Sequence, residues 1–433
     1  MGLATLLLSC AAHRSSSLVS HSSLPSDSLI LQQLRDYGIR FTDNNSVVLL
    51  FSGQEKFDDM FTAIRQARHS IHLEYFNFRN DSIASLLFDL LRQKRREGVE
   101  VRALFDGFGN DSNNQPLLKR HITSLRADSV DIHEFDPIRF PWVNHIWPRD
   151  HRKIVVIDGR VAYTGGMNVA DYYIKGTEQV GAWRDMHCRI EGSAVDDLHR
   201  IFFAAWEKVT GEQLDTARYL LSSQSVDFDS LKSDATPTAG HKLVGIVNRE
   251  PGTKRLADGS LLGRNTAMRY FYVNAIDDAR DSLRIINPYF TLIPSVSRAI
   301  KRAIKRGVKV ELMISAKSDI PLTPDCAFYQ MHRMMKRGAS VWLYQPGFHH
   351  SKIMMVDGRF CTVGSTNLDA RSLRFDYEEN AVIIDRHTTL QLDSMFDADK
   401  QQSIQLTPES WNSFRTPWQK FRGWFAHLLR PFL

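Results

Sequence analysis

The octapeptide His151-Arg152-Lys153-Ile154-Val155-Val156-Ile157-Asp158 returns later in the chain as His350-Ser351-Lys352-Ile353-Met354-Met355-Val356-Asp357. Aligned without gaps, the two stretches continue to Gly165-Gly166-Met167-Asn168 and Gly364-Ser365-Thr366-Asn367, at a constant offset of 199 residues. The His, Lys, Asp and final Asn are identical in the two copies. A motif that occurs twice is far more specific than a single match. The chain therefore contains two related halves.

The sequence around each motif also repeats. In the first half, hydrophobic periodicity predicts strands over residues 47–51, 70–76 and 99–105 and helices over 57–68 and 83–97. The second half repeats this order, with a helix ending at 276–282, a strand at 283–290 and a further strand after Gly307. Strands that alternate with helices predict an α/β fold with a largely parallel sheet. A repeat of about 200 residues is too long for a solenoid and indicates a duplicated domain.

Composition divides the 433-residue chain into five segments. Residues 1–45 are expected to form an N-terminal lead-in, 46–210 the first domain, 211–240 a linker, 241–405 the second domain and 406–433 a tail. The tail is aromatic and basic, and its apolar residues recur every three or four positions. They are Phe414, Trp418, Phe421, Phe425, Leu428 and Phe432. This spacing predicts an apolar helix face that suits either an interface of anionic lipid or packing on the protein's own surface.

The net charge of +6 and the pI of about 9.0 favour an anionic partner, which is either nucleic acid or an acidic membrane surface. No apolar run reaches the roughly 20 residues that a membrane-spanning helix needs. Leu7-Leu8-Ser9-Cys10 resembles the lipobox of bacterial lipoproteins, but the apolar stretch before it is short and carries no Lys or Arg. Either the true start lies upstream or this resemblance is accidental.

The repeated His and Lys suit phosphodiester chemistry. Residues i and i+2 of a strand face the same side, so each His projects together with its Lys. Two such pairs meeting at a pseudo-twofold axis would surround one phosphate. The lysines and asparagines would neutralise and bind its oxygens, while one histidine attacks phosphorus and the other protonates the departing oxygen. The candidate groups are His151, Lys153 and Asn168 in the first half and His350, Lys352 and Asn367 in the second.

Because the lysines supply the positive charge, this chemistry requires no metal ion or cofactor. The alternative is that duplication alone kept two strand-and-turn segments similar. The apolar residues of both segments do fit core strands, each followed by an Asp-Gly turn. Packing gives no reason, however, to keep an outward His and Lys in both copies.

These motifs resemble those of the phospholipase D superfamily, over residues 47–396. The resemblance implies two α/β/α sandwich domains, related by a pseudo-twofold axis, with one shared active site at their interface. It also implies an acidic residue downstream of each motif that orients that histidine. Asp185, in Trp183-Arg184-Asp185, matches this residue in the first half, and Glu378 matches it in the second. The motif carboxylates Asp158 and Asp357 are expected either to be catalytic or to brace the site structurally.

Within the superfamily, the chain resembles bacterial cardiolipin synthases. The aromatic tail and three segments carry this resemblance: Tyr163-Thr164-Gly165-Gly166-Met167-Asn168, Trp183-Arg184-Asp185 and Asn287-Pro288-Tyr289-Phe290. Two features depart from the family pattern. The chain lacks the N-terminal transmembrane helices of many members, which assigns membrane attachment to the tail, to Cys10 or to both. Asp150 also stands where Asn is more usual, and this carboxylate is expected to raise the pKa of His151.

The resemblance implies a phosphatidyltransferase held peripherally, or by a lipid anchor, on the bacterial cell membrane. In this hypothesis His151 attacks the phosphorus of one phosphatidylglycerol while His350 protonates the leaving glycerol. A second phosphatidylglycerol then resolves the phosphatidyl-histidine to cardiolipin, and the two histidines could exchange these roles. No nucleic acid partner is expected. The alternatives are a phospholipase D that uses water, a nuclease of the superfamily and a non-catalytic lipid-binding scaffold.

Overall fold

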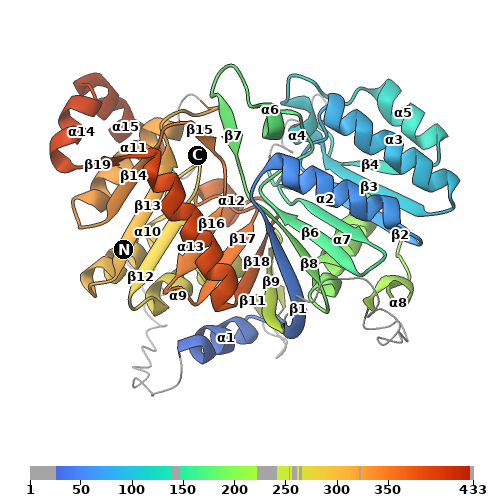
Figure 1. Ribbon diagram of the computed structural model, residues 1–433, viewed down its shortest axis with the longest axis horizontal. Coiled ribbons are helices and arrows are strands. Elements are labelled where there is room, and N and C mark those ends of the chain that lie inside the picture. Colours follow the sequence, from blue (N-terminus) through green and yellow to red (C-terminus); the bar gives the residue numbers. More distant parts are fainter. Residues whose placement is uncertain are drawn as a thin grey trace, which may run out of the picture.

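The computed structural model describes residues 26–138, 147–221, 241–252, 254–255, 261–262, 266–320 and 323–429. Within these residues, fifteen strands form one sheet that runs through the whole molecule, with helices on both faces (Figure 1). Cys10, residues 222–240 of the expected linker and the last four residues of the tail lie outside the described residues.

The strand order of the sheet repeats. In the first half the order is β1-β8-β6-β5-β2-β3-β4, and in the second it is β9-β18-β17-β16-β12-β13-β14, with β19 added at the edge. The first set is β1 (Phe41–Leu50), β2 (Ser70–Tyr75), β3 (Glu100–Asp106), β4 (Asp131–Phe135), β5 (Ile154–Ile157), β6 (Val161–Gly165) and β8 (His187–Glu191). The second set is β9 (Lys242–Arg249), β12 (Ser282–Ile286), β13 (Lys309–Ser315), β14 (Ser340–Tyr344), β16 (Ile353–Val356), β17 (Phe360–Gly364), β18 (Glu378–Ile384) and β19 (Ser403–Leu406). The strand-for-strand match confirms the duplicated α/β fold.

The two halves join through β1 and β9, which pair antiparallel at the centre of the sheet. Because these strands are equivalent, their antiparallel pairing relates the halves by a pseudo-twofold axis. The prediction of a largely parallel sheet was wrong, since only β2-β3-β4 and β12-β13-β14 are parallel. The motif strands instead form the hairpins β5-β6 and β16-β17. Each hairpin turns at an Asp-Gly pair with positive φ, 53° and 67° at Asp158 and Gly159, a conformation typical of tight hairpin turns.

Helices on the two faces give three layers (Figure 1). Alternate residues of β5 point to opposite faces. Val155 and Ile157 pack with α2 and α3, while Ile154 and Val156 pack with α7. The latter core also contains residues of β16 and α13, so it is continuous through both halves. The main covering helices are α2 (Gly53–Gln66), α3 (Ser82–Arg96), α5 (Lys119–Ala127), α7 (Val195–Thr210), α9 (Ala267–Asp278), α10 (Pro294–Lys305), α11 (Thr323–Met335) and α13 (Arg386–Gln401).

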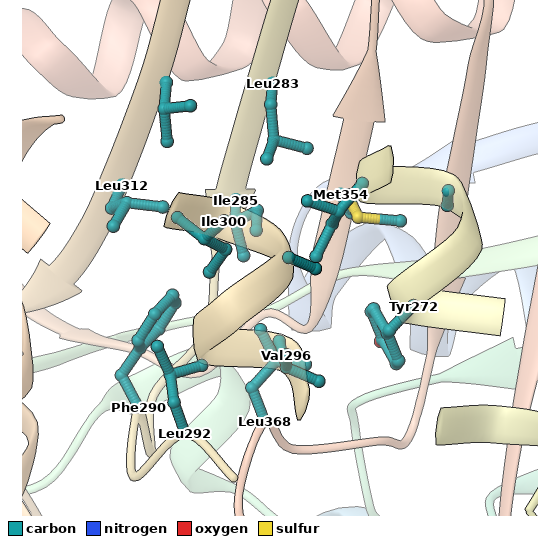
Figure 2. Close-up of a cluster of buried hydrophobic side chains, with 14 of the residues drawn as sticks. Tyr272, Leu283, Ile285, Phe290, Leu292, Val296, Ile300, Leu312, Met354 and Leu368 are labelled. Carbon is teal, nitrogen blue, oxygen red and sulfur yellow. The ribbon is translucent and has the colours of Figure 1, made fainter. Parts of the chain in front are cut away.

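The core of the second half is closely packed. Figure 2 shows Leu283 and Ile285 of β12, Leu312 of β13, and Val296 and Ile300 of α10 in one cluster. All five side chains are at most 1% exposed. Burying each of them contributes about 1.5–3 kcal/mol. This core fixes β12, the strand that pairs with the second motif strand β16.

An ordered helix lies within the segment predicted as a lead-in. Helix α1 (Ser26–Asp36) packs on α9, and its Ile30 and Leu34 are fully buried in the core of the second half. Strand β1 also begins earlier than predicted, at Phe41. The first residues of β1 are polar, so they do not show the hydrophobic pattern of a buried strand. Asn45 is nevertheless buried, and its amide donates to the carbonyl oxygens of Thr42 and Lys242.

The tail forms two helices, α14 (Pro408–Phe414) and α15 (Pro417–Leu429). Helix α15 packs on α11 through a narrow face of small residues: Ala426 is fully buried, and a Cβ at Gly423 would lie 2.7 Å from a backbone oxygen of α11. The aromatic face points away from the protein. Its residues are Trp418, Phe421, Trp424, Phe425 and Leu428, each between 45% and 64% exposed. The helix therefore rests on the protein and still exposes the predicted apolar face.

Candidate active site

Both motif histidines line one cavity of about 530 Å³ between the two halves. His151 lies immediately before β5 and His350 immediately before β16. The backbone of each is bound by the other half: the amide of His151 donates to the carbonyl of Tyr377 at 3.0 Å, and that of His350 donates to the carbonyl of Arg184 at 2.7 Å. In addition, β7 (Ala182–Arg184) pairs with β15 (Gly347–His349) across the junction. Pairing between the halves therefore aims both rings into the same cavity.

Each histidine is held by a carboxylate of the other half. Nδ1 of His151 lies 3.1 Å from Oε1 of Glu378, and Nδ1 of His350 lies 2.7 Å from Oδ2 of Asp185. The expectation that each acidic residue orients the histidine of its own half was wrong. The reason is the cross-junction backbone pairing, which brings Tyr377 beside His151 and Arg184 beside His350. A carboxylate on Nδ1 fixes the tautomer and leaves Nε2 for chemistry.

The two motif lysines contact the histidines that line the cavity. Nζ of Lys352 lies 2.7 Å from Nδ1 and 2.9 Å from Nε2 of His350, and Nζ of Lys153 donates to the carbonyl of His151. Burial lowers the pKa of Lys352 to about 7, against the opposing effect of Asp185, and burial also lowers the pKa of Lys153. An anion that binds beside such a lysine raises its pKa again and favours the charged ammonium form. The cavity is therefore suited to a phosphate group.

The two motif asparagines, Asn168 and Asn367, line the same cavity and are nearly buried. Within the described residues, the Oδ1 atom of each has no hydrogen-bond partner. Buried polar atoms of this kind are rare in folded proteins and usually await a ligand or water. Their amide groups are the right type to contact phosphate oxygens and a sugar or glycerol hydroxyl.

Asp158 and Asp357 lie away from the cavity. Asp158 is five residues beyond Lys153, about 16 Å along an extended chain. Its carboxylate accepts hydrogen bonds of 2.7–2.9 Å from the backbone amides of Arg68, His69 and Ser70. Asp357 binds the equivalent amides, from residues 280–282, at 2.8–3.2 Å. The geometry corrects the catalytic expectation and agrees with the structural alternative: each carboxylate ties its motif hairpin to the loop before β2 or β12.

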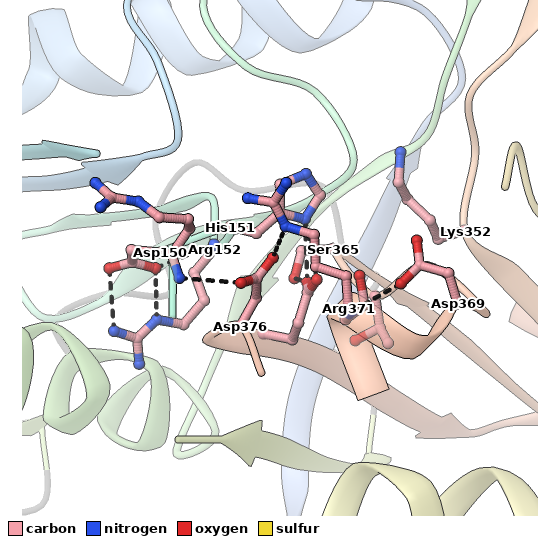
Figure 3. Close-up of polar contacts among 12 residues, drawn as sticks. Asp150, His151, Arg152, Lys352, Ser365, Asp369, Arg371 and Asp376 are labelled. Atoms are coloured by element: carbon pink, nitrogen blue, oxygen red, sulfur yellow. Dashed lines mark hydrogen bonds and ion pairs between the residues drawn. The ribbon is translucent and has the colours of Figure 1, made fainter. Parts of the chain in front are cut away.

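Asp150 raises the pKa of His151, as expected, but other groups outweigh this effect. Burial, followed by the charges of Lys153 and Lys352, lowers the pKa of His151 well below its usual value, and the Asp150 carboxylate opposes this only weakly. Asp150 is turned toward Arg152, whose Nε lies 3.1 Å from its Oδ1 (Figure 3). Burial, followed by Lys352, likewise lowers the pKa of His350, to about 4. Both imidazoles are therefore neutral at neutral pH.

Ser365, Glu379 and Arg371 belong to the site but were not predicted from the sequence. The hydroxyl of Ser365 donates to Glu378 and, at 3.1 Å, to Glu379. Burial raises the pKa of Glu378 to about 7 and that of Glu379 to about 8. Arg371 lines the cavity and pairs with Asp376 at 2.6 Å (Figure 3). Only the spacing of Ser365 from the motif histidine could have indicated a role.

Aromatic rings form the remaining wall of the cavity. The ring of Phe76 meets the edge of His151 at a centroid distance of 5.1 Å, and Trp183 and Tyr289 lie 5.4 Å and 6.0 Å from His350. In the sequence, Trp183 and Tyr289 belong to two of the segments that resemble cardiolipin synthases. In the structure these rings keep the two imidazoles in a partly apolar setting, which strengthens electrostatic contacts there.

Comparison with known proteins agrees with this fold and site. The family described as "Cardiolipin synthase, PLD-like domain" matches residues 60–185 and 272–400. A probable cardiolipin synthase of Bacillus subtilis is 33% identical over 377 residues, which cover 87% of this chain and 70% of that protein. A cardiolipin synthase of Oceanobacillus iheyensis is 32% identical over 407 residues, which cover 94% and 79% of the two chains. The crystal structure of phosphatidylserine synthase from Haemophilus influenzae shares the fold, with a TM-score of 0.67 at 14% identity, covering 94% of this chain and 100% of that chain.

The fold and the paired motifs define a phospholipase D-like enzyme. The family match and the relatives narrow this class further: the chain belongs to the phospholipase D-like cardiolipin synthase family, whose members are phosphatidyltransferases. Among the described residues, no helix combines the length and the apolar character that crossing a bilayer requires.

Proposed function

We propose that the protein condenses two phosphatidylglycerol molecules into cardiolipin and glycerol through a phosphatidyl-histidine. The observation that carries this proposal is the pair of imidazoles, one from each half, on the wall of one cavity, each with its motif lysine against it. Two imidazoles of lowered pKa suit a two-step exchange. One must be an unprotonated nucleophile, and the other must donate a proton in the first step and accept one in the second.

His151 is the proposed nucleophile. Its Nδ1 contacts Glu378, and no hydrogen bond from a described residue occupies its Nε2. Nε2 of His350, by contrast, already lies 2.9 Å from the Lys352 ammonium. In the first step, Nε2 of His151 bonds to phosphorus while the glycerol oxygen leaves and takes a proton from His350. The approach of the anionic phosphate raises the pKa of His350, which favours the protonated form needed for this transfer.

In the second step, the terminal hydroxyl of another phosphatidylglycerol attacks the same phosphorus. His350, now neutral, accepts the hydroxyl proton, the bond between phosphorus and His151 breaks, and cardiolipin forms. The lysine and asparagine side chains stabilise the charge on the non-bridging oxygens throughout. The exchange of one phosphodiester for another needs no nucleotide.

The exposed aromatic face of α15 supports attachment to an anionic membrane surface. Five large apolar side chains face outward on this helix, while its half-buried cations Lys420 and Arg422 contact Asn412 and Asp325 of the protein. Exposed aromatic rings on a basic helix suit the boundary between headgroups and acyl chains of anionic lipid. This surface would hold the protein peripherally on the cell membrane that contains its substrate.

The direct test incubates the purified protein with phosphatidylglycerol alone and analyses the products by mass spectrometry. The proposal predicts cardiolipin and free glycerol in equal amounts. Phosphatidic acid as the only product would identify a hydrolase, and degradation of added DNA would identify a nuclease. His151→Ala and His350→Ala should each abolish turnover, because the two rings serve one site.

A further inference from the structure

A second cavity adjoins the active-site cavity, and no step described above uses it. It has a volume of about 460 Å³, and Trp147 lines both cavities. Two guanidinium side chains, Arg249 and Arg374, lie on its wall with the rings of Trp147 and Phe375, whose centroids are 6.2 Å apart. The cavity therefore combines positive charge with aromatic surface, directly beside the reacting centre.

Arg249 has little to balance its charge. The side chain is 2% exposed, it donates to the backbone carbonyl of Asp376, and within the described residues its Nε has no hydrogen-bond partner. The Asp376 carboxylate is engaged by Arg371 at 2.6 Å instead. Burial lowers the pKa of Arg249 to about 10, although Asp376 and Glu378 oppose this. No described carboxylate pairs with this buried guanidinium, and its planar fork of donors matches the oxygens of a phosphate.

The sheet fixes Arg249 beside the catalytic centre. Arg249 of β9 is the direct cross-strand partner of Glu378 of β18. Directly opposed residues have side chains on the same face of the sheet and Cα atoms about 5 Å apart. Glu378 contacts the ring of His151. The side chain of Arg249 therefore leaves the sheet on the same face as Glu378, one strand away from the residue that holds His151. This separation suits two phosphates that a single glycerol joins, as in cardiolipin.

We propose that this second cavity, the acceptor cavity, binds the phosphate of the acceptor lipid through Arg249 and Arg374. The inference rests on the proposed function and deepens it. With its own phosphate held there, the acceptor's terminal hydroxyl reaches the phosphatidyl-histidine: the oxygen bonds to phosphorus, the bond to Nε2 of His151 breaks, and the proton passes to His350. Water and free glycerol carry no phosphate, so the cavity favours a phospholipid acceptor over both.

The test measures how one intermediate partitions between two acceptors. Full-length protein is incubated with phosphatidylglycerol and isotopically labelled glycerol, and mass spectrometry gives the initial rates of cardiolipin and of labelled phosphatidylglycerol. Their ratio depends only on the second step, so partial loss of folded enzyme does not change it. Arg374→Gln should lower the ratio of cardiolipin to labelled phosphatidylglycerol about tenfold, as expected for one charge-assisted phosphate contact. Arg298→Gln, which removes an exposed arginine of α10, is the matched control and should leave the ratio unchanged.

Arg249→Lys provides a second variant that keeps the buried positive charge and loses the fork of donors. It should lower the same ratio while labelled glycerol still exchanges. An unchanged ratio in both variants, or an equal fall of the ratio in the Arg298→Gln control, would overturn the acceptor cavity while leaving the proposed function intact. A wild-type protein that exchanges glycerol but never forms cardiolipin would instead refute the proposed function, and the acceptor cavity with it.

Discussion

Replacing Asp185 by asparagine should remove most of the activity, although Asp185 belongs to the half that does not carry His350. Its Oδ2 lies 2.7 Å from Nδ1 of His350, and both groups are buried. Burial alone would raise the pKa of Asp185, but Lys352 and His350 lower it below its usual value, so the carboxylate is ionised at neutral pH. At an effective dielectric constant of about 20, its attraction for the His350 imidazolium is about 6 kcal/mol.

The amide oxygen of asparagine retains a dipole at this position, so the net loss should be about 4 kcal/mol. That loss corresponds to a factor of about 10³ in kcat/KM. The rate is measured as cardiolipin formed from phosphatidylglycerol by mass spectrometry. A fall of less than about threefold would refute the reasoning, because neutral hydrogen bonding alone would then suffice.

The pairing itself can be observed apart from activity. In protein with isotopically labelled histidine, the Nδ1 proton of each catalytic ring should give a strongly downfield NMR signal. Asp185→Asn should remove the His350 signal and keep that of His151, and Glu378→Gln should do the opposite. The reverse pattern would mean that each carboxylate serves its own half.

Three further outcomes are expected. Asp158→Ala leaves three backbone amides without their acceptor, so it should destabilise the fold by about 3 kcal/mol in thermal denaturation; loss of activity in fully folded protein would restore a catalytic role. Because burial lowers the pKa of Lys352 to about 7, its ammonium form is lost as pH rises through that value. The kcat/KM for phosphatidylglycerol should therefore fall on the alkaline side, and a flat profile between about pH 6 and about pH 9 would contradict this. Changing Trp424 and Phe425 of α15 to serine should weaken binding to phosphatidylglycerol vesicles about thirtyfold, from about 1 kcal/mol for each half-exposed ring. Leu390→Ser, at an exposed residue of α13, is the control, and binding is measured by vesicle sedimentation. An equal loss of binding in both variants would show that α15 is not the membrane-binding surface.

The duplication and the main groups of the site could be predicted from the sequence, because the same His, Lys and Asn recur at the same spacing in both halves. It could not predict which carboxylate meets which histidine. That pairing depends on contacts between the halves, at Tyr377 with His151 and at Arg184 with His350, and no local pattern encodes them. Ser365 and Arg371 were missed for the same reason, since neither residue type is informative outside its surroundings.

The errors in the fold have equally local causes. Alternation of strands and helices describes only β2 to β4 and their counterparts, whereas the Asp158-Gly159 turn reverses the chain and makes the motif strands antiparallel. Helix α1 was missed because it is only 11 residues long and its buried residues, Ile30 and Leu34, pack on the second half of the chain.

The most direct test of the shared site uses a phosphatidyl ester of p-nitrophenol, a leaving group that departs without a general acid. His350→Ala should release one equivalent of p-nitrophenol per enzyme and then stop, with a phosphatidyl adduct on the peptide that contains His151. His151→Ala should release none. Release by His151→Ala with none from His350→Ala would reverse the two roles. Sustained turnover by either variant alone would contradict the claim that the two histidines act on one phosphorus atom.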